Sequence, residues 1–112
     1  MESILTSIKK LLGIMPEYTH FDADLIMHIN TVFSILQQLG VGPAFSITDA
    51  NTTWSEYTER TDIEMLKTYI ALKVKLMFDP PLSSVAVDAM KNQIAEFEWR
   101  LNVAVDPGEP QS

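Results

Sequence analysis

The sequence predicts an all-α protein, a four-helix bundle-like domain with a long ordered loop between its second and third helices. Apolar side chains recur at the spacing of one helix face in four separate segments. Each segment is bounded by a capping residue or by a glycine or proline that stops a helix. We expect a single domain over residues 1–105 and a mobile C-terminal tail over residues 106–112, which contain two prolines and a glycine.

The first predicted helix runs from about Glu2 to Leu12 and carries its apolar side chains on one narrow arc. Lys9 and Lys10 lie elsewhere on the wheel, near the C-terminal end, where positive charge suits the helix dipole. Gly13 is the expected stop.

The second predicted helix runs from about Asp22 to Leu39 and has one continuous apolar stripe. Asp22 is the expected N-cap, and Phe21 and Ile26 have the spacing of a hydrophobic staple. Gly40 is expected to end this helix.

Residues 41–60 are too long for a simple helix connection and too apolar for a loose one. Residues 45–47 have the character of a short extended piece. Thr53 and Glu56 match a capping box, so one or two helical turns are expected to begin at Trp54. The side chains expected to pin this segment against the bundle are Val41, Phe45, Ile47, Trp54 and Tyr57.

The third predicted helix runs from Thr61, with Glu64 completing a capping box, to Asp79, where Pro80 and Pro81 stop it. Its side chains are apolar around well over half of the circumference, which is typical of a helix enclosed by protein. Lys73 lies within that apolar arc. Burying its ammonium group unpaired is costly, so the group must reach water or a carboxylate. One interpretation is that the side chain extends along its own stem to water, and the other is that it pairs with a carboxylate of a neighbouring subunit.

The fourth predicted helix is capped by Ser83 or Ser84 and runs to about Val103. Trp99 faces almost opposite its apolar stripe, close to the direction of Val103. An outward tryptophan on a small domain often anchors a protein–protein contact. The competing interpretation is that the 41–60 segment or the tail covers Trp99.

The composition restricts the possible functions. A net charge of −7 argues against nucleic-acid binding as the main task, because phosphate contacts need clustered Lys and Arg. The absence of cysteine fits a reducing compartment and leaves no thiol nucleophile. No apolar stretch reaches the roughly 18–20 residues that span a bilayer, and residues 1–12 lack the pattern of a signal peptide, so we expect a soluble protein.

The histidines give little support to catalysis. Asp24 lies one turn before His28, so an Asp–His pair is possible, whereas His20 lies in the preceding turn. A zinc site needs three or four convergent ligands, and no Glu-x-x-His or His-x-x-x-His array is present. We therefore expect no catalytic residue, no metal and no cofactor.

Several segments together resemble a known family, the small head–tail connector (adaptor) proteins of tailed bacteriophages and of prophages in Gram-positive bacteria. No single segment is a catalytic signature, and the specificity lies in their combination and order. The segments are residues 4–13 (ILTSIKKLLG), 28–33 (HINTVF), 36–43 (LQQLGVGP), 67–81 (KTYIALKVKLMFDPP) and 96–102 (EFEWRLN).

The resemblance implies a structural virion protein at the head–tail interface, made in the host cytoplasm. It implies a homo-oligomeric ring, typically dodecameric, beneath the portal protein. The ring would extend the DNA channel without binding DNA specifically and would dock the next neck or tail protein, with no membrane involved. The candidate interface residues are Trp99, Val103, Lys73, Phe45, Trp54 and Tyr57.

Two other functions remain open at this stage. One is a small acidic helical prophage regulator or inhibitor that binds a single protein partner. The other is an enzyme that uses His28 and Asp24. A native mass measurement separates the first from a ring-forming protein, and mutation of His28 tests the second.

Overall fold

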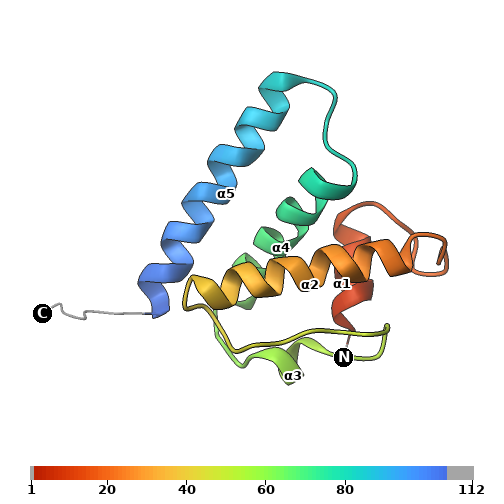
Figure 1. Ribbon diagram of the computed structural model, residues 1–112, viewed down its shortest axis with the longest axis horizontal. Helices are drawn as coiled ribbons and strands as arrows, with labels where there is room; N and C mark the ends of the chain where they lie inside the picture. The colour runs from red at the N-terminus through yellow and green to blue at the C-terminus, as the bar shows by residue number, and fades with distance from the viewer. Residues whose placement is uncertain (1, 106–112) are drawn as a thin grey trace, which may run out of the picture.

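The computed structural model describes residues 2–105, and the predicted mobile tail over residues 106–112 lies outside them. The all-α prediction is confirmed: the described chain folds into helices joined by loops (Figure 1), with one isolated antiparallel bridge between Ser3 and Thr53. The helices are α1 (Ile4–Leu11), α2 (Asp22–Gln38), α3 (Trp54–Tyr57), α4 (Ile63–Phe78) and α5 (Ser84–Val105).

The core is built around α4, which contacts α1, α2 and α5. In Figure 1, α4 lies between α5 on one side and α1 and α2 on the other. The side chains of Leu66, Tyr69, Ile70 and Val74 are fully buried. This arrangement explains why α4 is apolar around most of its circumference, and it confirms the prediction of a central helix.

The predicted cap of α2 is wrong. Asp22 is the first residue of the helix, and Phe21 occupies the N-cap position without a side-chain hydrogen bond. The Asp22 carboxylate instead accepts a hydrogen bond of 2.8 Å from the Lys9 ammonium group. The buried Lys9 ammonium group therefore binds the Asp22 carboxylate that was predicted to cap the helix.

The predicted capping box of α4 is also wrong, since the helix begins at Ile63, after Asp62. The Arg60 guanidinium group donates two hydrogen bonds, of 2.8 and 2.7 Å, to the Asp62 carboxylate. This contact holds the pKa of Asp62 below its usual range. The segment before α4 is thus organised by an ion pair, and Thr61 lies in the turn that precedes the helix.

The other predicted helix ends agree with the structure to within one or two residues. α1 and α2 are followed by Gly13 and Gly40, whose φ angles are positive, at 82° and 80°. α4 ends at Phe78, just before the two prolines. At the start of α5, the Ser83 hydroxyl accepts a hydrogen bond of 3.3 Å from the amide of Ala86, as expected of a cap.

The long segment between α2 and α4 is ordered against the bundle. α3 begins at Trp54, and the capping box of Thr53 and Glu56 is present, as predicted. The Trp54 indole donates a hydrogen bond of 2.9 Å to the Ser7 hydroxyl of α1. No strand forms at residues 45–47 in the described chain, where both backbone groups of Ile47 are hydrogen-bonded to the Asn30 side chain.

Candidate assembly surface

The outer face of α5 carries an exposed apolar edge. α5 buries Ile94 and Leu101, so the opposite side of the helix faces away from the core. Trp99 is 67% exposed and Val103, one turn later, is 47% exposed. The prediction that Trp99 points outward is confirmed, and the segment 41–60 does not cover it.

This edge is held in place at the C-terminal turns of α5. The Asn102 side chain donates a hydrogen bond of 2.7 Å to the carbonyl of Leu39, at the end of α2. Arg60 donates a weaker one, of 3.4 Å, to the carbonyl of Leu101. Trp99 therefore projects from a helix that is tied to two other parts of the chain, which fixes the direction in which this helix face points.

Lys73 has a carboxylate partner in its own chain. Its ammonium group lies 3.9 Å from Oε2 of Glu98 on α5, and the Tyr69 hydroxyl donates a hydrogen bond of 2.8 Å to the same oxygen. The pKa of the Tyr69 phenol is raised, mainly because the side chain is buried and also because of this contact with Glu98. The three side chains form a polar link between α4 and α5.

The aromatic candidates of the 41–60 segment lie in the interior of the chain. Trp54 and Tyr57 are each 4% exposed, and Phe45 is half-buried. Phe33 of α2 lies 5.4 Å from the Phe45 ring and 4.6 Å from the Tyr57 ring, measured between centroids. The prediction that these residues pin the segment to the bundle is confirmed. Trp54 and Tyr57 expose almost no surface with which to make the predicted interface contact.

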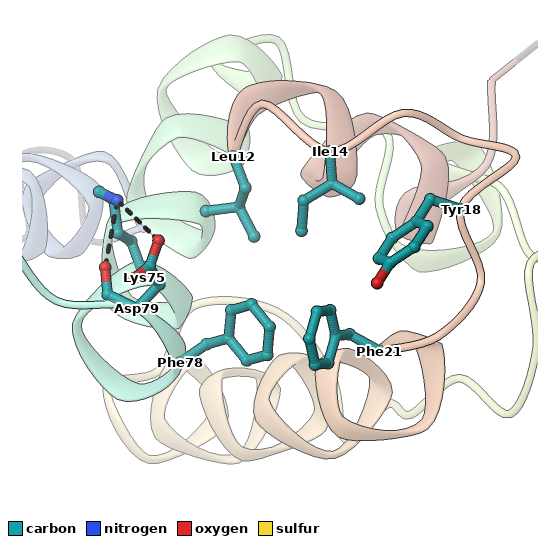
Figure 2. A pocket seen from close by; sticks show the side chains of 7 residues that line it. All are labelled: Leu12, Ile14, Tyr18, Phe21, Lys75, Phe78 and Asp79. Atoms are coloured by element: carbon teal, nitrogen blue, oxygen red, sulfur yellow. Dashed lines mark hydrogen bonds and ion pairs between the residues drawn. The ribbon is translucent and has the colours of Figure 1, made fainter.

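A second apolar feature is a pocket of about 420 Å³ where the end of α1, the α1–α2 loop and the end of α4 meet. Figure 2 shows two aliphatic side chains on one side of the pocket, facing two phenylalanine rings on the other, with the tyrosine at one end and an ion pair at the other. The lining residues are Leu12, Ile14, Tyr18, Phe21, Lys75, Phe78 and Asp79.

Aromatic contacts form one wall of this pocket. The Phe21 and Phe78 rings meet edge to face at a centroid distance of 5.1 Å. Both histidines lie beside this wall: His20 is 4.7 Å from Phe21, and His28 is 6.2 Å from Phe78, measured between ring centroids. The structure thus brings the two histidines near the same aromatic pair.

Lys9 holds in place the α1–α2 loop, which carries Tyr18 at one end of the pocket, and the sequence analysis missed this role. The residue is 2% exposed, and its ammonium group donates hydrogen bonds to the carbonyls of Pro16 and Tyr18, at 2.9 and 2.7 Å, as well as to Asp22. These bonds fold the α1–α2 loop over the end of α1. The available signal was the position of Lys9 one turn after the buried Leu5.

The cations of the chain are largely neutralised by its own carboxylates. Within residues 2–105, seven of the eight Lys and Arg side chains form an ion pair with an acidic side chain of the same chain. The surface therefore offers little unpaired positive charge for phosphate contacts.

Two further observations concern the described residues. None of the helices in residues 2–105 is long and apolar enough to cross a membrane. In the same part of the chain, no group of three or more His, Asp or Glu side chains is placed to hold a metal ion.

The comparison with protein families gives one finding. A family model described as phage connector protein matches residues 4–108, which is nearly the whole chain. No curated protein and no solved structure matches the chain.

Proposed function

The chain belongs to the phage connector protein family, and on that premise we propose that it is a structural adaptor of the head–tail interface. In this proposal, copies of the chain form a ring beneath the portal protein. The ring continues the DNA channel and provides the docking surface for the next neck or tail protein. The family match over residues 4–108 is the observation that carries the proposal, because it spans every helix of the chain.

The exposed apolar surface supports an assembly role. Trp99 and Val103 form an edge on a well-anchored helix, and tryptophan is enriched among residues that dominate binding energies. An intersubunit ion pair at Lys73 is not part of this proposal, since Glu98 of the same chain is within 3.9 Å.

The charge distribution supports passage of DNA without tight binding. Affinity for DNA rises with the number of phosphates that Lys and Arg neutralise, because each contact releases counterions. This chain carries a net charge of −7, and most of its cations are already paired. A ring of such subunits would present few sites that hold DNA in place.

Assembly with portal rings is the direct test. The purified chain would be examined by native mass spectrometry and by electron microscopy, alone and after mixing with portal rings of the same phage. We expect a large discrete oligomer, either spontaneously or on the portal. A chain that stays monomeric at all concentrations and never associates with portal rings would contradict the proposal. A stable complex of one copy with one other phage or host protein would instead favour a prophage regulator.

A further inference from the structure

The exposed edge of α5 and the apolar pocket lie on opposite sides of the folded molecule. In Figure 1 the C-terminal turns of α5 lie at the left, whereas the α1–α2 loop and the end of α4 lie towards the right. One feature is convex and carries an indole, and the other is a recess lined by aliphatic and aromatic side chains. Complementary patches at different sites produce a head-to-tail contact, which closes into a ring when the rotation between neighbours allows it.

The size and lining of the pocket suit a large aromatic side chain. A volume of about 420 Å³ is within the range of roughly 300–1,000 Å³ typical of pockets that enclose small organic molecules. The Phe21 and Phe78 rings offer edges and faces against which an indole can pack. Tyr18, at the end of the pocket away from the ion pair, is 52% exposed and is therefore accessible to a neighbouring copy.

The charges beside the two features are also complementary. Residues 75–79 read Lys-Leu-Met-Phe-Asp, and residues 96–100 read Glu-Phe-Glu-Trp-Arg. In each segment the first and fifth residues form an ion pair, and the fourth residue is aromatic. The cation comes first in residues 75–79, whereas the anion comes first in residues 96–100. When the Trp99 indole packs against Phe78, Glu96 and Arg100 of one copy therefore come close to Lys75 and Asp79 of the next. Such exposed pairs orient a contact more than they strengthen it.

We propose that the ring contact is made by Trp99 and Val103 of one copy, seated in the pocket between α1, the α1–α2 loop and α4 of the next copy. This inference rests on the proposed function, since it names the contact that would build the ring. Lys9 contributes indirectly, as a positioning residue, because its bonds to Pro16 and Tyr18 hold the loop that places Tyr18 at one end of the pocket.

Two variants separate the two halves of the contact. Trp99→Ala removes the edge and keeps the pocket, whereas Ile14→Trp fills the pocket and keeps the edge. Each variant alone is expected to lose assembly, with an association constant at least about 30-fold below that of the wild type. A mixture of the two retains one edge and one pocket that match, so we expect a 1:1 complex that grows no further. Tyr18→Asp serves as a second pocket variant if Ile14→Trp does not fold.

Disulfide trapping reports which positions come together, and the chain has no cysteine of its own to compete with the engineered ones. A Val103→Cys chain, which keeps the Trp99 anchor, is mixed with a Met15→Cys chain, which keeps every lining residue of the pocket, and the mixture is expected to form a cross-linked dimer under mild oxidation. The control replaces Val103→Cys with Val85→Cys, an exposed position at the other end of α5. We expect no cross-link from the control pair.

The possible outcomes distinguish this inference from the proposed function. Rings that form on the portal with both Ile14→Trp and Tyr18→Asp chains, as they do with the wild type, would overturn the pocket contact and leave the adaptor role intact. Dimers of Ile14→Trp alone would also overturn it, since they indicate a symmetric contact between two α5 edges. Loss of assembly on deletion of residues 106–112, with Trp99→Ala unaffected, would assign the pocket to the tail instead.

Discussion

The Lys9 ammonium group lies 2.8 Å from a carboxylate oxygen of Asp22, in a position where only 2% of the lysine is exposed. The pair connects the end of α1 to the start of α2, and the two carbonyls that share the ammonium group lie in the loop between them. All three hydrogens of the ammonium group thus have an acceptor, which offsets the cost of burying the charge.

Lys9→Met is expected to lower the free energy of unfolding by about 2–3 kcal/mol. Loss of one partner of a buried pair typically costs more, and Asp22 keeps some access to water, which reduces the penalty. Urea denaturation would measure the change. Lys10→Met is the matched control, because Lys10 pairs with Glu2 at the surface and its loss should change stability little. Equal effects of the two substitutions would contradict the importance of the buried pair.

Replacement by alanine is expected to lower the stability of the monomer strongly at Trp54 and hardly at all at Trp99. Trp54→Ala should cost about 3–5 kcal/mol of unfolding free energy, because the indole is 4% exposed and is hydrogen-bonded to Ser7. Trp99→Ala should change it by no more than about 0.5 kcal/mol. Thermal or urea unfolding of the monomer measures both. A strongly destabilised Trp99→Ala monomer would show that Trp99 belongs to the core.

Gly42→Ala should destabilise the fold more than Gly13→Ala. Both glycines have positive φ angles, of 86° and 82°, so both substitutions carry backbone strain of about 1–2 kcal/mol. A Cβ atom at Gly42 would also lie 2.6 Å from the Tyr57 hydroxyl oxygen, whereas one at Gly13 would meet nothing within 4 Å. The overlap adds about 1–3 kcal/mol. Denaturation curves that coincide for the two variants would refute this steric account.

Stability is expected to fall as the pH rises above about 10. Burial raises the pKa of Tyr57 from 10.0 to about 12, and burial and Glu98 raise that of Tyr69. The folded state therefore retains protons that the unfolded chain releases, so this contribution is complete below pH 10 and is lost as the pH rises through 12.

Unfolding free energies measured across this alkaline range, together with tyrosinate absorbance, would check the prediction. Tyr57→Phe and Tyr69→Phe each remove one of the two groups and should flatten the decline. A decline of the same steepness in the double variant would assign the pH dependence to other groups.

Much of the fold followed from local patterns in the sequence. The capping box at Thr53 requires only residues three apart, and the stripe of each helix depends on a spacing that any helix imposes. Neither depends on distant contacts. The wrong cap at Asp22 has the opposite cause, because Lys9 of α1 binds the carboxylate that was expected to cap the helix. At Thr61 the cause is local, since Arg60 pairs with Asp62 and the helix begins after that pair.

The sequence by itself determined the all-α class, the central position of α4, the outward direction of Trp99 and the family resemblance that the family match bears out. Only the tertiary structure decided that Lys9 is buried, that Lys73 has Glu98 as a partner and that α1, the α1–α2 loop and α4 enclose an apolar pocket. The physical reason is that helix periodicity is a property of neighbouring residues. Ion pairs and pockets arise where separate helices meet, and no spacing along one helix specifies them.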